Sequence, residues 1–137
     1  MRTYLVDGTN AVRRGGYDPR FPEVEEARTE HLLVRVQDLA ERSGARIEVE
    51  LFFDGPRRTL PASTSSPVRV RWTLDGDADA AILGSARRLL NAGRGAVVVT
   101  EDGGLASDVK AEGGRAMRCS AVHRVSPSAV LPATTIS

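Results

Sequence analysis

Five short apolar runs predict the β-strands of this chain. They are rich in β-branched and aromatic residues and are bounded by glycine, proline or acidic turn residues, as strands commonly are. The fourth run, Ala-Val-Val-Val, is continuously apolar, which is typical of a strand covered on both faces of its sheet. The predicted strands cover residues 3–7, 46–53, 68–72, 96–99 and 115–119.

Between these runs, apolar residues recur at helical spacing. The longest predicted helix covers about residues 23–43, and Gly44 follows it in a position that suits a C-terminal stop. Shorter helices are predicted over residues 77–91 and 104–112. Residues 8–22 contain Gly-Gly, Asp-Pro and Phe-Pro pairs, so they are predicted to form a loop.

The alternation of strands and helices predicts the fold class. It implies an α/β protein, a three-layer α/β/α sandwich around a mostly parallel five-stranded sheet with right-handed crossovers. The link between the second and third strands has no evident helix, so the direction of the strand at 68–72 stays open. Without an internal repeat or linker, residues 1–125 are predicted to form one domain. Residues 126–137, rich in serine, proline and threonine, are predicted to be a disordered tail.

Acidic residues gather where such a sheet forms its sites. Open parallel sheets bind ligands beyond the carboxyl ends of their strands, and three of the predicted strands are followed there by an aspartate. Three more aspartates precede or open the helix at 77–91. Each alone is also explained as a turn residue or a helix cap, but together they predict one acidic cluster. The six residues are Asp7, Asp54, Asp75, Asp77, Asp79 and Asp102.

A cluster of carboxylates requires a cation or a proton. Two carboxylates ~5 Å apart repel by roughly 3 kcal/mol at an effective dielectric constant of ~20, and further acids add to this. Oxygen ligands suit Mg²⁺ or Mn²⁺ rather than zinc, and His31 and His123 show no metal-ligand spacing. Carboxylate-held Mg²⁺ serves phosphoryl chemistry in particular, because it activates water and neutralises charge on phosphate.

The distribution of the basic residues is more informative than the net charge of +1, and it fits either a rim that binds a polyanion or a solvated basic loop. Lys110 is the only lysine among 19 basic residues, and arginine is well suited to phosphate contacts. A bias in codon composition also explains this usage. Tyr17 and Trp72 could either stack on bases or pack in the core. The arginines expected to rim the acidic cluster are Arg13, Arg14, Arg57, Arg58, Arg69 and Arg71.

Composition places the chain among ordinary globular proteins. Hydrophobic residues make up 41% and charged residues 27% of its 137 residues. No apolar run approaches the ~18 residues of a membrane span, so no association with a membrane is expected. The single cysteine, Cys119, cannot form an internal disulfide and fits a reducing compartment. A cytoplasmic location is therefore expected.

Several short motifs resemble those of one known family. Residues 6–10, Val-Asp-Gly-Thr-Asn, resemble the Asp-Gly-x-Asn opening of NYN-domain proteins, which belong to the PIN-like nucleases. Residues 76–82 look like the Ala-Asp-x-x-Ile helix start of that family, and residues 99–102 resemble its Val-Thr-Ser-Asp segment. Residues 53–55 and the Ser-Ala pair at 120–121 are weaker matches. The likeness extends over most of the chain and is closest to the YacP-like branch.

The resemblance implies a metal-dependent ribonuclease that uses Mg²⁺ or Mn²⁺ and cuts RNA endonucleolytically. Messenger RNA and RNA near ribosomes are among the implied partners. Asn10 would orient the carboxylates or a bound water, and Thr100 would hydrogen-bond the cluster. The implied metal-binding acids are Asp7, Asp79 and Asp102, with Asp77 and Asp54 as second choices. Substrate contacts are expected from Arg13, Arg14, Arg57, Arg58 and Thr100.

Two positions depart from the family pattern. Glu101 replaces the usual serine, and Gly103 stands where an arginine often follows the last aspartate, which leaves the grip on substrate there open. The Asp-Gly-Thr at 7–9 also suggests a haloacid-dehalogenase phosphatase, but Leu5 occupies the position of its nucleophilic aspartate. A receiver-like domain is disfavoured because Lys110 falls inside a predicted helix. The remaining alternative is a catalytically inert RNA-binding module of the same fold. The RNA target, endonucleolytic against exonucleolytic cutting, the number of metal ions and the oligomeric state stay open.

Overall fold

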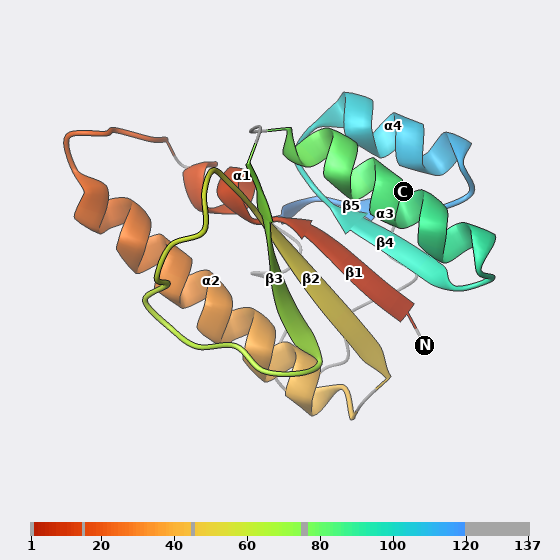
Figure 1. Ribbon diagram of the computed structural model, residues 1–137, viewed down its shortest axis with the longest axis horizontal. Helices are drawn as coiled ribbons and strands as arrows, with labels where there is room; N and C mark the ends of the chain where they lie inside the picture. Colours follow the sequence, from red (N-terminus) through yellow and green to blue (C-terminus); the bar gives the residue numbers. More distant parts are fainter. Residues whose placement is uncertain (1, 15, 45, 75–76, 120–137) are drawn as a thin grey trace.

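The computed structural model describes residues 2–14, 16–44, 46–74 and 77–119. Five parallel strands form one sheet in the order β3-β2-β1-β4-β5, with helices on both of its faces (Figure 1). This is the three-layer sandwich that the alternating pattern predicts. The strands are β1 (Arg2–Asp7), β2 (Ile47–Asp54), β3 (Val68–Thr73), β4 (Gly95–Val99) and β5 (Arg115–Met117).

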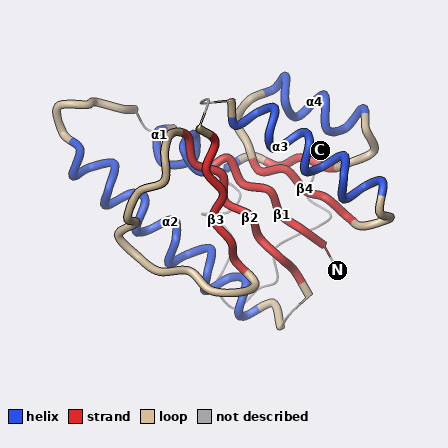
Figure 2. Tube along the Cα trace, viewed as in Figure 1, coloured by secondary structure: helices blue, strands red, loops and turns tan. Residues whose placement is uncertain are grey.

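Helices cover both faces of the sheet (Figure 2). Side chains of a strand point alternately to opposite faces, so Tyr4 and Val6 of β1 join the core beneath the first helix pair, and Leu5 joins the core beneath the second. All three side chains are buried. The first pair is α1 (Gly8–Arg13) and α2 (Pro22–Arg42), and the second is α3 (Ala78–Asn91) and α4 (Gly103–Ala111).

The strand β3 settles the direction that the sequence left open. It runs parallel to β2, with Val68 opposite Val49 and Thr73 opposite Asp54. The connection from β2 to β3 contains no helix. Leu60 and Ala62 of this connection pack against the core cluster that lies beneath α2, where a crossover helix would otherwise cover the sheet. The sheet of the described residues is therefore wholly parallel.

The prediction of a loop over residues 8–22 was wrong for its first part, which forms α1. The glycine and proline pairs that suggested a loop lie after this helix. Asp7 caps it, and Ala11 and Val12 bury its inner side. Other boundaries shift by a few residues, and β5 ends at Met117. The predicted tail at 126–137 and the Ser-Ala pair lie outside the described residues.

Gly8 fixes the start of α1 against the sheet. A Cβ atom at Gly8 would lie 2.8 Å from Cε1 of Phe53 and 2.9 Å from the carbonyl oxygen of Phe52. Those distances are too short for any other residue, so glycine permits the close approach of α1 to β2. The neighbouring Asp7 is thereby held at the carboxyl end of β1. In the part of the chain that the structure describes, no helix has the length and apolar character to cross a bilayer.

Candidate active site

The beginnings of α1, α3 and α4 lie at the carboxyl edge of the sheet (Figure 1). Each of these helices is capped by an aspartate whose Oδ1 accepts a hydrogen bond from a backbone N–H of the first turn. The bond to Asp7 comes from Asn10 at 3.3 Å. The bond to Asp77 comes from Ala80 at 3.0 Å, and that to Asp102 comes from Leu105 at 3.0 Å. This shared N-cap geometry brings aspartates from distant parts of the chain to one edge.

Asp79 and Asp102 form the central pair of the edge. Asp79 lies in the first turn of α3, and a side-chain hydrogen bond to Asp102 is among the causes that raise its pKa. Burial, followed by this bond and the charge of Asp102, raises the pKa of Asp79 to about 6. The backbone N–H of Leu105, followed by Asp79, lowers the pKa of Asp102. The pair therefore holds a proton on Asp79 at mildly acidic pH.

Asp7 is the most enclosed acid of the edge, with a relative exposure of 5%. Burial is the main cause that raises the pKa of this carboxyl group, and the charges of Asp54 and Asp102 add to the increase. Hydrogen bonds from Asn10 act in the opposite direction. Asp7 also contributes to the raised pKa of Asp79. The charges of the acids at this edge thus affect one another's pKa values.

No basic side chain of the described residues forms an ion pair with Asp7, Asp79 or Asp102. Nor do the described residues contain a group of three or more His, Cys, Asp or Glu side chains that could hold a metal ion. Mg²⁺ commonly takes only one or two carboxylates and completes its shell with water and phosphate oxygens. The Asp79–Asp102 pair, with oxygen donors only, fits that requirement.

Asp54 lies beside this group, at the end of β2. Its backbone N–H donates to Oγ1 of Thr9 at 2.8 Å, and Oγ1 of Thr73 donates to its Oδ1 at 3.2 Å. The two threonines tie α1 and β3 to the end of β2. Sequence reasoning missed both of them, although Thr9 stands inside the opening motif. Asp75, another predicted member of the cluster, falls outside the described residues.

Asn10 and Thr100 have supporting positions. The backbone and side chain of Asn10 both hydrogen-bond Asp7 and stabilise its charged form. Thr100 is 3% exposed, and its Oγ1 accepts a hydrogen bond from the backbone N–H of Asp102 at 3.1 Å. This geometry suits support of the turn before α4 better than direct contact with a ligand.

The predicted arginines are distributed differently from the acids. Arg13 pairs with Glu25, which is the main cause that raises the pKa of its guanidinium. Arg58 donates to the carbonyl oxygen of Asp54 at 3.4 Å and lies 4.9 Å from the centroid of the Trp72 ring. Arg14 and Arg57 are exposed. Arg69 and Arg71 lie on the sheet face and pair with Glu50, so the structure does not bring them to the acidic edge.

Two further cations lie on the other side of Asp102. A cavity of about 290 Å³ is lined by Asp102 together with Lys110 and Arg118. Sequence reasoning considered Lys110 only for a receiver-like domain and did not consider Arg118. Helical spacing gives a signal for Lys110, because positions 103, 107 and 110 recur on one side of α4. The sequence offers no comparable signal for Arg118.

Comparison with known proteins reveals a shared fold. No protein-family profile matches the sequence, and no curated protein matches it. Among solved structures, the chain is similar to Rae1 (YacP) from Bacillus subtilis in a mutant form, with a TM-score of 0.68 and 22% identity over 90% of this chain and 74% of that chain. A second structure of Rae1 (YacP) from Bacillus subtilis gives a TM-score of 0.66 and 22% identity, covering 88% and 70% of the two chains. The predicted likeness to the YacP-like branch is confirmed at the level of the fold.

Proposed function

We propose that the acidic edge is the active site of a ribonuclease that depends on a divalent metal and hydrolyses phosphodiester bonds within RNA. The observation that carries this proposal is the group formed by Asp79, Asp102 and the buried Asp7 at one edge, whose charges affect one another and which has no ion-pair partner among the described residues. A structural acid cluster would be expected to contain a compensating arginine, because uncompensated carboxylates destabilise the folded state. A site prepared for a cation has no such requirement.

Asp7, Asp79 and Asp102 are the proposed metal ligands, with Asp77 as a second choice. When bound, a divalent ion supplies a more acidic water and neutralises negative charge on the phosphate and the leaving oxygen. Hydrogen bonds from Asn10 favour the charged form of the Asp7 carboxylate and partly oppose the effect of its burial. Thr100 fixes the turn that presents Asp102. The fold already holds Asn10 and Thr100 in these positions, so neither role requires a conformational change.

The cations on both sides of the acids are proposed to hold the RNA backbone. Arg58 lies on the side of β2, and Lys110 and Arg118 lie on the side of α4. Arg14 and Arg57 are exposed and can reach a passing strand. The lysine and arginine beside Asp102 offer charge near Gly103, where the family pattern has an arginine. Contacts of this kind neutralise phosphates without reading sequence.

The biological setting follows from the family resemblance alone. It favours messenger RNA, including RNA near ribosomes, as substrate. Cys119 is buried, and burial raises the pKa of its thiol to about 12, so it stays protonated. An unreactive free thiol is compatible with the proposed cytoplasmic location.

A metal titration on a circular single-stranded RNA tests the proposal. The purified chain is incubated with the RNA in excess chelator, and Mg²⁺ or Mn²⁺ is then added. Cleavage is expected only with the metal, and opening of a circle requires endonucleolytic cutting because the substrate has no ends. Asp7→Asn should lower the cleavage rate at least about 100-fold, as loss of an essential charged group in an active site does.

The matched control is Asp38→Asn, which changes an aspartate of α2 that pairs with Arg42 on the surface. It should cleave at the unmodified rate, and circular dichroism should show that both variants are folded. Cleavage that persists in chelator, or in Asp7→Asn, would remove the proposed site. RNA binding without cleavage under every metal would instead support the inert RNA-binding module, an alternative favoured by the lack of a three-acid metal group among the described residues.

A further inference from the structure

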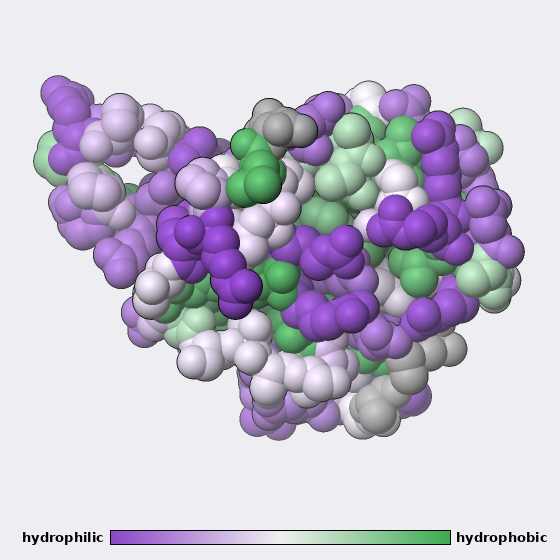
Figure 3. Space-filling model, in the orientation of Figure 1, coloured by the Kyte–Doolittle hydropathy of each residue, from purple (hydrophilic) through white to green (hydrophobic). Residues whose placement is uncertain are grey.

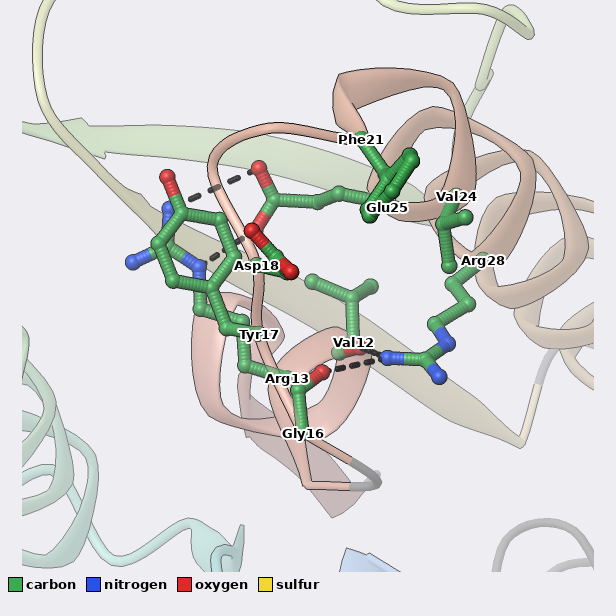
Figure 4. Close-up of a pocket in the computed structure, with 9 residues that line it drawn as sticks. All are labelled: Val12, Arg13, Gly16, Tyr17, Asp18, Phe21, Val24, Glu25 and Arg28. Atoms are coloured by element: carbon green, nitrogen blue, oxygen red, sulfur yellow. Dashed lines mark hydrogen bonds and ion pairs between the residues drawn. The ribbon is translucent and has the colours of Figure 1, made fainter.

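A second hollow opens at the far end of α1 from the acids (Figure 4). It has a volume of about 370 Å³ and lies between the end of α1, the following loop and the start of α2. Figure 4 shows Tyr17 and Phe21 on opposite sides of this hollow, with Val12 and Gly16 at its base. This loop and the start of α2 project from the body of the molecule at the left of Figure 3.

Exposed apolar side chains concentrate in this hollow. Five large hydrophobic residues are exposed in the part of the chain that the structure describes, and three of them line it. Single exposed apolar residues need no explanation, but several around one concave site mark a binding surface. The three are Tyr17 (50% exposed), Phe21 (49%) and Val24 (44%), whereas Val34 (56%) and Leu74 (74%) lie elsewhere.

The Tyr17 side of the hollow is held in place by contacts within the chain, without a ligand. The guanidinium carbon of Arg13 lies 3.8 Å from the centroid of the Tyr17 ring, and Glu25 pairs with the same guanidinium. Arg28 of α2 donates to the carbonyl oxygen of Gly16 at 2.6 Å, which fastens the loop to the helix. A preorganised wall loses little conformational entropy when it binds a flat ligand.

The short helix α1 connects the acidic edge to the hollow. This helix begins next to Asp7 and ends at Arg13, which corresponds to an axial distance of about 9 Å for its six residues. The charge of Asp54 contributes to the raised pKa of Arg13, so the arginine lies within electrostatic reach of the edge. A strand whose phosphate lies at the acids could therefore place a nearby base in the hollow.

We propose that this hollow binds one unstacked base of the RNA strand, with Tyr17 as the stacking platform and Arg13 behind it. Phe21 and Val24 form the opposite wall. Aromatic rings and guanidinium planes are the groups on which single-stranded bases stack, with little dependence on base identity. The inference rests on the proposed function for the position of the strand, and it adds a subsite that selects unpaired RNA.

The test measures binding rather than cleavage. Single-stranded oligoribonucleotides are bound to the protein in excess chelator, and each carries one abasic position that is moved along the strand. One position should weaken binding by about 5- to 150-fold, the range expected for loss of one base stack. Tyr17→Ala should weaken binding of the intact strand by the same factor and should make that abasic position neutral. Tyr17→Phe should restore both affinity and the abasic effect, because it retains the ring.

Val34→Ala is the matched control, since it removes an exposed apolar side chain of α2 outside the hollow, and it should bind RNA as the unmodified chain does. Abasic effects that are the same in Tyr17→Ala and the unmodified chain would overturn the base subsite, as would unchanged RNA affinity of Tyr17→Ala. Unchanged RNA affinity of Tyr17→Ala would instead indicate that the hollow binds a side chain of a partner protein.

The two proposals fail separately. If RNA is cleaved only with metal but no abasic effect depends on Tyr17, the ribonuclease proposal is retained and the base subsite is rejected. Coupling between Tyr17 and one base without cleavage under any metal would retain the subsite on an inert RNA-binding module.

Discussion

Two regions of the sheet carry buried acids, and they are neutralised in different ways. On the face of β2 and β3, Glu50 is 7% exposed and lies between two arginines. Nη2 of Arg69 is 3.0 Å from its Oε2, and Nη1 of Arg71 is 3.5 Å from its Oε1. Strongly hydrophilic side chains gather over these strands at the centre of Figure 3. At the carboxyl edge, Asp7 is comparably buried. The charged residues that affect its pKa are other aspartates, Asp54 and Asp102.

Under the proposed function, the difference separates a structural acid from acids that would bind a cation. Glu50 is compensated by its own chain, although its Oε1 accepts no hydrogen bond within the described residues and Arg71 contributes charge at longer range. Asp79 and Asp102 have no ion-pair partner among the described residues, and burial together with the neighbouring Asp102 raises the pKa of Asp79. Burial alone therefore does not identify a functional acid. The neighbouring charge does.

The largest expected effect compares Asp102→Asn with Glu50→Gln. Asp102→Asn should lower metal-dependent RNA cleavage at least about 100-fold and abolish the thermal stabilisation that Mn²⁺ gives the unmodified chain. Glu50→Gln should change both by little, because Glu50 lies away from the edge. Thermal melts with and without Mn²⁺ measure the metal response without reference to activity. An equal loss of the Mn²⁺ response in both variants would contradict the comparison.

The next effect concerns stability. Replacing both Arg69 and Arg71 by alanine leaves Glu50 buried without a partner, which should lower the free energy of unfolding by about 2 kcal/mol. Glu50→Gln should cost less than about 1 kcal/mol, because the freed arginines are partly exposed and can be hydrated. Urea denaturation of the two variants measures the difference. A greater loss of unfolding free energy in Glu50→Gln than in the double arginine variant would show that Glu50 is not the residue whose burial needs compensation.

Asp54 provides an intermediate case, since it adjoins the acids but has hydrogen-bond partners of its own. Asp54→Asn should reduce kcat/KM for RNA by less than about tenfold, which corresponds to less than about 1.4 kcal/mol of transition-state stabilisation. The amide retains an acceptor for the hydroxyl of Thr73. Steady-state cleavage assays measure the effect. A loss as large as that of Asp102→Asn would make Asp54 a member of the central group.

The smallest effect is a pH dependence of stability in the metal-free protein. The pKa of Asp79 is raised to about 6 in the folded state, from a model-peptide value near 4. The folded chain therefore binds more protons than the unfolded chain between these pH values, so this group lowers stability as the pH rises from about 4 to about 6. Because Asp79 is largely exposed, its contribution should stay below about 1 kcal/mol.

Asp79→Asn removes that contribution, so the difference in unfolding free energy between the variant and the unmodified chain should grow across this pH window. Denaturant titrations at a series of pH values in chelator measure it. A difference that is flat with pH would show that Asp79 does not share its proton with Asp102.

Much of the fold could be predicted from local patterns. The apolar runs located the five strands, and helical spacing located α2, α3 and α4 within a few residues. These features depend on nearest neighbours along the chain, so the sequence displays them directly. The short helix α1 was not predicted, because its stability comes from the cap at Asp7 and from burial of Ala11 and Val12 against distant elements.

The candidate site was predicted in part. The rule for parallel sheets brought Asp7, Asp54 and Asp102 to one edge of the predicted sheet. It could not reveal that the neighbouring Asp102 contributes to a raised pKa of Asp79, nor that Thr9 fastens α1 to Asp54. Hydrogen bonds of this kind depend on ångström-scale packing between segments that are far apart in the chain.

By itself, the sequence determined the order of the elements, the faces they bury and the placement of aspartates after the strands, because each follows from a local period or from a residue at a strand end. Tertiary structure alone decided that β3 runs parallel, that Arg69 and Arg71 neutralise Glu50, and that Tyr17 and Phe21 face one hollow. The physical reason is that charge compensation and concavity arise between surfaces. Those surfaces meet only when the helices pack on the sheet.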